Sequence, residues 1–223
     1  MAGSGKKIKK HVFKFIEMIK IIDYGQGNLA SIKNMITYLG YSASISSNID
    51  EIKKASKLIL PGVGSFDTGI NNLRKLDLFS LIKEKVMIDK CPILGICLGA
   101  QLMLEKSAEG NERGLSVVKG EVVSFSNLFV KKNIRLPIPN MGWRDVEFDE
   151  SFGIKFKNKP PKFYFVHSFF IDLKEKGSQL IKTKYGIEFC AGFKYEHIMA
   201  VQFHPEKSHN YGKEVLKYFI NNV

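Results

Sequence analysis

A cysteine stands between two glycines where the chain could make a sharp turn. Residues 95–99 read Gly-Ile-Cys-Leu-Gly, after an apolar run and before a segment of helical character. This is the thiol form of the nucleophile elbow, in which glycines avoid Cβ collisions with nearby backbone. A helix N-terminus just after the cysteine also favours the thiolate. The pattern predicts Cys97 as a nucleophile, although a free cysteine after an apolar strand is also a common core residue.

A histidine and a glutamate follow another apolar run near the C-terminus. Residues 201–206 read Val-Gln-Phe-His-Pro-Glu. If a strand over 199–204 ends at the same sheet edge as the cysteine, His204 lies at its end. Glu206, two residues further on, can then lie on the same side of the chain as His204. The carboxylate would then hold one ring nitrogen while the other takes a proton from sulfur. We expect His204 to be the base and Glu206 its orienting partner, whereas an isolated His-x-Glu is more often structural.

A third stretch of interest is a glycine-rich loop after an apolar run. Residues 60–66 read Leu-Pro-Gly-Val-Gly-Ser-Phe. Gly62 and Gly64 would leave the backbone around Val63 free to aim an amide at a developing oxyanion, beside the amide of Leu98. Taken alone, the same residues also suit a simple tight turn.

Short apolar runs alternate with helical patterns in the first half of the chain. We expect strands over 19–23, 41–46, 58–60 and 92–96, and helices over 29–39, 49–54, 77–88 and from 98 onward. This βαβ rhythm predicts a mostly parallel sheet flanked by helices, with functional loops at the carboxyl ends of the strands.

The second half has a different character. Strand patterns cover 117–125, 146–148, 163–167, 187–193 and 199–204, joined by turns rich in Gly, Asn, Lys and Pro, and a last helix is expected over 211–220. We therefore expect an antiparallel β extension packed on the first sheet. The predicted fold class is α/β.

Composition limits the classes of protein to consider. The chain has 223 residues, 44% of them apolar, and a net charge of +12. The lysines are scattered, so the charge does not indicate a nucleic-acid surface, and no apolar run is long enough to span a membrane. We expect residues 1–17 to be a flexible basic extension, residues 18–223 to be one domain, and the protein to be cytoplasmic.

The three cysteines lack metal-ligand spacing, so neither a disulfide framework nor a metal site is predicted.

Together, the glycine loop, the cysteine elbow and the His-x-Glu, in that order, resemble the class I, or triad, glutamine amidotransferases. The similarity extends over nearly the whole chain from Met18. Five stretches narrow it to the subfamily of glutaminase subunits that serve imidazole glycerol phosphate formation in histidine biosynthesis. These stretches are residues 21–29, 61–66, 139–143, 164–168 and 202–208.

The resemblance implies a role for each of these residues. Cys97 would attack the carboxamide of glutamine, His204 would protonate the leaving ammonia, and Glu206 would orient His204. Gln101 would help to hold glutamine, while Gly62, Val63 and Leu98 would frame the oxyanion site. No cofactor or metal is implied. The family passes its ammonia to a (β/α)₈ cyclase or synthase subunit, so a heterodimer is expected, with Trp143 at the interface.

One departure from the subfamily pattern leaves the partner open. The usual Pro-His-Met-Gly-Trp-Asn is here Pro-Asn-Met-Gly-Trp-Arg, with Asn140 and Arg144 as the differing residues. The alternative is a paralogous subunit that supplies ammonia to a sugar-modifying synthase in surface polysaccharide biosynthesis. Two other classes also remain: a non-enzymatic regulatory partner, which the intact Cys97, His204 and Glu206 disfavour, and a stand-alone cysteine hydrolase.

Overall fold

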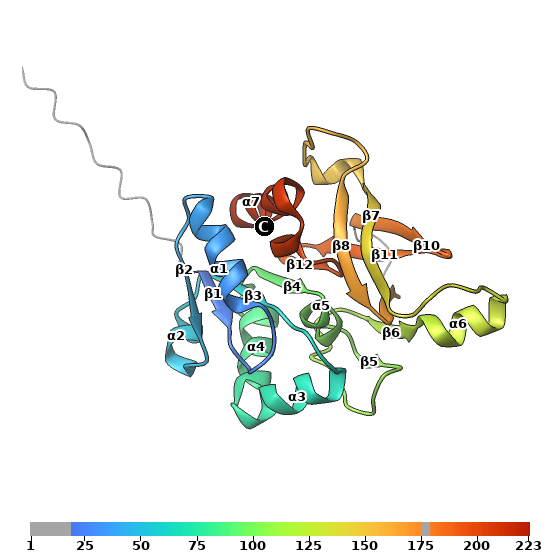
Figure 1. Cartoon of the computed structure of the whole chain (residues 1–223). Coiled ribbons are helices and arrows are strands. Elements are labelled where there is room, and N and C mark those ends of the chain that lie inside the picture. Colours follow the sequence, from blue (N-terminus) through green and yellow to red (C-terminus); the bar gives the residue numbers. More distant parts are fainter. Residues whose placement is uncertain (1–18, 175–178) are drawn as a thin grey trace, which may run out of the picture.

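The computed structural model describes residues 19–174 and 179–223, so the expected extension over 1–17 lies outside the described residues. Figure 1 shows one continuous sheet with helices above and below its strands at one end and mostly strands at the other. The first part of the chain and the last strand build the end with helices, which we call the parallel half. The remaining strands build what we call the antiparallel half.

The parallel half is a five-stranded sheet in the order β2-β1-β3-β4-β12, with every neighbouring pair parallel. Its strands are β1 (Ile19–Ile22), β2 (Ala43–Ser46), β3 (Lys57–Leu60), β4 (Ile93–Ile96) and β12 (Ile198–Val201). The expected strands are confirmed within a few residues, and β3, β4 and β12 are buried throughout. The carboxyl ends of these three strands therefore meet at one edge.

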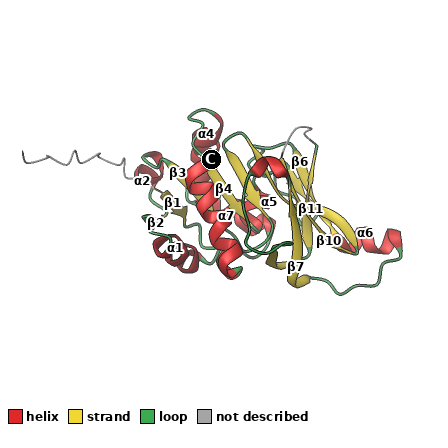
Figure 2. Cartoon of the chain, turned by 90° about the horizontal axis from the view of Figure 1, so that it is seen from above, coloured by secondary structure: helices red, strands yellow, loops and turns green. Residues whose placement is uncertain are grey.

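Helices cover both faces of the parallel half. Because strand side chains alternate, Leu58 and Leu60 of β3 face one helical layer while Ile59 faces the other. Figure 2 shows the helices on either side of the strands. One layer holds α1 (Leu29–Tyr38) and α7 (His209–Asn222). The other holds α2 (Ile49–Lys53), α3 (Phe66–Lys75), α4 (Leu78–Met87) and α5 (Leu98–Leu102).

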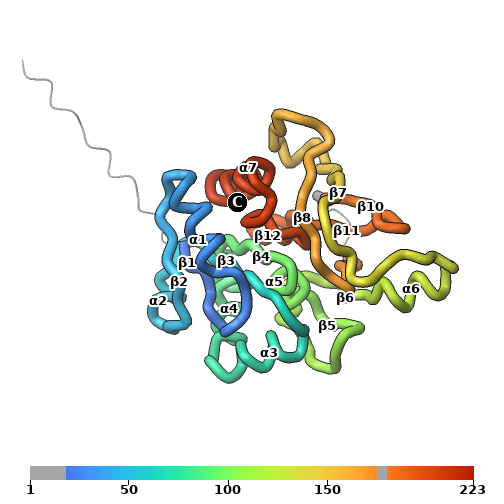
Figure 3. Tube along the Cα trace, viewed as in Figure 1, coloured from blue at the N-terminus to red at the C-terminus, as the bar shows by residue number. Residues whose placement is uncertain are grey.

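The two ends of the described chain pack together. Figure 3 shows α7, at the C-terminus, beside α1 near the start of the domain. Tyr41, just after α1, is hydrogen-bonded to Asn221 at 3.0 Å. The C-terminal segment thus completes the parallel half: β12 pairs with β4, and α7 packs beside α1 in the same helical layer.

The antiparallel half continues the same sheet. We expected it to pack on the first sheet, but β11 pairs directly with β12, and the order runs on as β11-β10-β7-β8. A branch from β11 leads through β9 to β6 and β5. The elements are β5 (Lys106–Ser107), β6 (Gly120–Ser124), α6 (Phe125–Lys132), β7 (Asn140–Phe148), β8 (Lys162–His167), β9 (Phe169–Leu173), β10 (Gln179–Tyr185) and β11 (Ile187–Tyr195).

Aromatic side chains hold the antiparallel half together. Phe125 lies between the rings of Phe129, Phe170 and Phe189, with centroids 4.6 to 5.3 Å apart. Phe163 and Phe203 stack at 4.0 Å and join β8 to the segment after β12. Among the described residues, no helix is long and apolar enough to cross a membrane.

Candidate active site

Cys97 lies at a strained turn between β4 and α5. Its backbone has φ 54° and ψ −111°, a conformation that is costly for a residue with a side chain. The Cys97 amide donates to the carbonyl of Val201 in β12 at 2.8 Å, which ties the turn to the neighbouring strand. A Cβ on Gly99 would lie 1.8 Å from the carbonyl oxygen of Leu60, so only glycine fits. The structure therefore has the predicted elbow, at the edge where β3, β4 and β12 end.

His204 and Glu206 form a buried pair next to this turn. The Nδ1 of His204 lies 2.8 Å from Oε1 of Glu206, and the two side chains are 2% and 1% exposed. His204 follows β12, and Glu206 lies in the short 3₁₀ helix η2 (Pro205–Lys207). The hydroxyl of Ser208 donates to the His204 carbonyl at 2.6 Å, and the His204 amide donates to Tyr164 at 2.9 Å. These bonds hold the His204 backbone in place, and the contact of Nδ1 with Glu206 orients the imidazole ring.

The electrostatics of the site favour a charged histidine. Burial lowers the pKa of His204, but the interactions of the imidazole with the nearby Cys97 sulfur and Glu206 carboxylate outweigh burial and raise its pKa to about 10. Among the described residues, none forms a hydrogen bond with the buried Nε2 of His204. This nitrogen is therefore the one available to exchange a proton with the Cys97 sulfur.

Cys97 and His204 open onto a cavity of about 320 Å³. Three more of the predicted residues, Val63, Leu98 and Gln101, also line it. Gly62 does not line the cavity but packs behind it, against Leu98 and Gly99. The whole lining consists of Val63, Gly64, Cys97, Leu98, Gln101, Glu109, Pro139, Val166, His167, Ser168, Phe169 and His204.

The glycine loop holds one of the two expected oxyanion donors in place. The Leu98 amide donates to the carbonyl of Gly62 at 3.3 Å, so it is engaged within the protein. The preceding carbonyl, of Pro61, accepts a hydrogen bond from the Tyr24 hydroxyl at 2.6 Å. Burial, and then the Cys97 charge, raise the pKa of Tyr24, so it stays a neutral donor. The loop is thus anchored at Pro61 and turned with the Gly62 oxygen toward Leu98.

Sequence reasoning missed two polar side chains at the site. Glu109 lines the cavity from the loop after β5, and its Oε2 accepts from the Phe66 amide at 2.9 Å. Gln202 is fully buried and contacts both Cys97 and Gln101. No local pattern signals either residue, because Glu109 lies in a loop and the chain bends at Gln202 and Phe203, so the alternation of β12 does not extend to His204.

Asn140 and Arg144, the two departures from the subfamily pattern, act as a unit. Nδ2 of Asn140 lies 3.0 Å from Nε2 of His167, and its Oδ1 accepts from Nε of Arg144 at 3.0 Å. The Arg144 guanidinium also lies over the ring of Tyr185, 4.8 Å from its centroid. His167, a lining residue of the cavity, has its Nδ1 at 2.7 Å from the Phe169 carbonyl. The two substitutions therefore reach the wall of the site through His167.

The other cysteines are poor nucleophile candidates. Burial raises the pKa of both Cys91 and Cys190, the latter to about 12. All three cysteines are free thiols. In the part of the chain that the structure describes, no group of three or more His, Cys, Asp or Glu is placed to hold a metal ion.

The site combines a cysteine elbow with a buried His–Glu pair at the carboxyl edge of a parallel sheet. This combination is typical of α/β enzymes with a thiol nucleophile. The family model for glutamine amidotransferase class-I matches residues 20–223. The chain belongs to this family.

Curated relatives cover nearly the whole chain. The protein from Methanococcus maripaludis named imidazole glycerol phosphate synthase subunit HisH 2 is 43% identical over 213 residues, which is 92% of this chain and 100% of the relative. HisH 1 of Campylobacter jejuni strain RM1221 is 43% identical over 91% of this chain and 99% of its own length. HisH 2 of Pseudomonas aeruginosa is 40% identical, covering 92% and 100%.

Solved structures share the fold. A glutamine amidotransferase crystal structure has a TM-score of 0.72 at 18% identity, covering 91% of this chain and 96% of that one. The structure of PurLQS from Thermotoga maritima has a TM-score of 0.66 at 17% identity, covering 92% and 97%. These likenesses support the α/β architecture with its antiparallel extension.

Proposed function

We propose that this chain is a glutaminase subunit that releases ammonia from glutamine and passes it to a synthase, for imidazole glycerol phosphate formation in histidine biosynthesis. The observation that carries the proposal is one cavity onto which Cys97 and His204 both open, with Glu206 buried behind the histidine. The names of the relatives, at about 40% identity over nearly the full chain, supply the pathway.

The chemistry follows from the charges of the site. The Cys97 thiolate attacks the carboxamide carbon of glutamine, the C–N bond breaks, and the His204 imidazolium donates its proton to the leaving ammonia. A glutamyl thioester remains. Neutral His204 then takes a proton from water as the water attacks the thioester, which releases glutamate and restores the thiolate. Glu206 keeps the imidazole oriented and stabilises its positive charge through both steps.

The polar lining of the cavity suits an amino acid. Glu109 supplies a carboxylate for an α-ammonium group, and Gln101 supplies an amide from α5. The cavity volume of about 320 Å³ is small, which fits a substrate of this size. We assign Glu109 and Gln101 to binding of glutamine.

Exposed apolar side chains on the antiparallel half and the glycine loop support a docking face for the partner. Val63 is 44% exposed and lines the cavity, and Met141 on β7 is 56% exposed and pairs in register with Val166 of the cavity wall. Water-exposed apolar groups near an active site are typical of an interaction surface. We call this surface the docking face. We propose that it consists of the exposed side chains of Val63, Leu136, Ile138, Met141 and Trp143.

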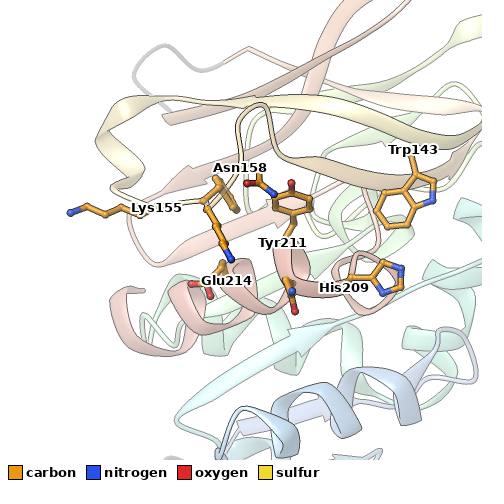
Figure 4. A pocket seen from close by; sticks show the side chains of 9 residues that line it. Trp143, Lys155, Asn158, His209, Tyr211 and Glu214 are labelled. Atoms are coloured by element: carbon orange, nitrogen blue, oxygen red, sulfur yellow. The ribbon is translucent and has the colours of Figure 1, made fainter.

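Trp143 lies where the docking face meets a second cavity. Its indole stacks on the His209 ring at 5.4 Å, with an interplanar angle of 7°. Figure 4 shows Trp143 from β7 beside His209, with Tyr211 and Glu214 of α7 further along the same cavity. This cavity, of about 590 Å³, contains neither Cys97 nor His204, so we assign it to partner docking rather than to the reaction. We propose a (β/α)₈ synthase subunit as the partner in a heterodimer.

The glycine loop gives a physical reason for partner control. The Leu98 amide is bound to the Gly62 carbonyl, so it cannot stabilise an oxyanion until this bond breaks. Val63 lies in the same loop and on the docking face, so a bound partner can shift the loop directly. Because losing one oxyanion donor typically reduces the rate by about 10²- to 10³-fold, the free subunit should be nearly silent.

The test is glutamate release by the chain alone, with a histidine-pathway (β/α)₈ synthase, and with that synthase and its acceptor substrate. We expect an increase of at least about 10²-fold in the complete mixture. Equal turnover alone and in complex would defeat the partner control. Activation only by a sugar-modifying synthase would transfer the chain to the polysaccharide pathway, and no glutamate release in any mixture would defeat the glutaminase assignment.

A further inference from the structure

Gln202 links the nucleophile to the side chain expected to hold the substrate. Its Nε2 donates to the sulfur of Cys97 at 3.7 Å, and its Oε1 accepts from Nε2 of Gln101 at 3.0 Å. Gln202 is fully buried and does not line the cavity. It therefore acts on the site only through the two residues that it contacts.

The position of Gln202 follows from the strand that it ends. It comes directly after β12 and two residues before His204, where the chain bends at Gln202 and Phe203 and leaves the strand. The sulfur of Cys97 thus receives an amide donor from Gln202 in addition to its coupling with the imidazole. The backbone amide of Gln202 donates to the carbonyl of Ala191 in β11 at 2.8 Å. This bond fixes Gln202 between the two halves of the sheet.

The amide of Gln101 has little freedom as a result. One of its Nε2 hydrogens goes to Gln202 and the other to the Phe169 carbonyl, each at 3.0 Å. An amide nitrogen has only two hydrogens, so the Oε1 is the one polar atom of this side chain left for a ligand. A buried amide such as Gln202 is costly unless its hydrogen bonds are made, which makes this arrangement hard to rotate.

We propose that Gln202 is a positioning residue for glutamine hydrolysis. It supports the Cys97 thiolate with one N–H group, and it fixes Gln101 so that an acceptor oxygen faces the α-ammonium end of the substrate. This inference rests on the proposed glutaminase function, because that function makes Gln101 a substrate-binding residue.

The experiment uses Gln202→Met, which keeps the volume of the side chain and removes both hydrogen bonds. Two quantities are measured: the rate of Cys97 alkylation by iodoacetamide across pH, and kcat and KM for glutamine in the complex with its synthase. The matched control is Thr183→Val, which removes the buried bond from Thr183 Oγ1 to the Asp145 carbonyl in β7, away from the site. Thermal unfolding is recorded for every variant.

We expect alkylation of Gln202→Met at pH 7 to slow by about threefold to tenfold, because a hydrogen bond to the charged sulfur is lost. KM should rise by about tenfold, and the rise should not add to that of Gln101→Ala, since both changes release the same amide. If the methionine variant fails to fold, the same alkylation rate is measured on Gln202→Glu. A carboxyl group beside the sulfur should also slow alkylation.

Unchanged alkylation and KM, or equal changes in Thr183→Val, would overturn the inference. So would full additivity with Gln101→Ala. The alkylation assay needs no glutamine turnover, so it still tests the Gln202 contact if the wild-type complex proves inactive. That inactivity would count against the proposed function instead.

Discussion

The two halves of the sheet contribute to the site in different ways. The parallel half supplies the reacting groups at the ends of buried strands, with Cys97 fixed by backbone contacts to β3 and β12. The antiparallel half supplies one wall of the cavity, including His167, and most of the docking face. The reacting groups thus lie at the ends of buried parallel strands, and the proposed docking face lies mainly on the half held by aromatic side chains.

This division suggests that chemistry and its control can be altered separately. Changes at the ends of the parallel strands should reduce turnover while leaving partner binding intact. Changes on β7 and β8 should alter stability or partner response while leaving the triad in place. Variants from each half therefore test the division directly.

The largest effect is expected at His204. His204→Asn should reduce glutamate release in the complex by about 10³-fold or more, because the proton donor for ammonia is lost. Glu206→Gln keeps the shape of the side chain and removes the charge that stabilises the imidazolium, so its loss should be smaller. Steady-state kinetics on both variants, with synthase binding measured in parallel, check this order. Near-normal turnover of His204→Asn would remove His204 from the mechanism.

A second prediction concerns His167 on the antiparallel half. Burial, assisted by the charges of His204 and Arg144, lowers the pKa of His167 to about 4, although the Phe169 carbonyl acts in the opposite direction. The unfolded chain, with a histidine pKa near about 6.5, then binds more protons between about pH 4 and 6.5. Stability attributable to His167 should therefore be complete above this window and fall by on the order of 3 kcal/mol as the pH falls through it.

His167→Gln can reproduce both neighbouring hydrogen bonds without titrating. Its free energy of unfolding should change less steeply with pH over this window than that of the wild type. The difference between the two proteins should be constant above about pH 7.5. Identical slopes in denaturant titrations at pH 4.5 to 6.5 would show that His167 is not held neutral.

The smallest effect is expected at the docking face. Trp143→Ala should weaken synthase binding by about tenfold, since exposed aromatic residues often dominate interfaces. The control is Ile88→Ala, another exposed apolar residue, which precedes β4 and so lies at the opposite edge of the sheet. Isothermal titration with the synthase compares the two. Equal affinities for both variants would place the interface elsewhere.

The parallel half was predictable because its signals are local. Ile93–Ile96 is apolar at every position, as expected of a strand covered on both faces, and the glycines around Cys97 predict a turn that the structure confirms. The helix α3 is not among the expected elements, although Phe66, Ile70 and Leu73 have helical spacing, because the glycines just before it indicate a loop.

Much of the antiparallel half was not predictable from local signals. No strand is expected over β9 or β10 and no helix over α6, and the strand expected over 117–125 covers only Gly120–Ser124 in the structure. Phe125 is the first residue of α6. Aromatic residues favour strands, but Phe125 is buried here in an aromatic cluster that is assembled from distant segments. The contacts of Glu109 and Gln202 also depend on long-range packing, so nothing near them in the sequence indicates them.

The most direct test of the account is covalent labelling by a glutamine analogue that carries an electrophile in place of the carboxamide. The synthase complex is treated with the analogue, and the modified peptide is identified by mass spectrometry. We predict modification of Cys97 alone, because burial raises the pKa of both Cys91 and Cys190 and neither lines the cavity. Cys97→Ala, with its fold intact by circular dichroism, should take up no label and release no glutamate. Labelling mainly at Cys91 or Cys190, or glutamate release by Cys97→Ala, would contradict the account.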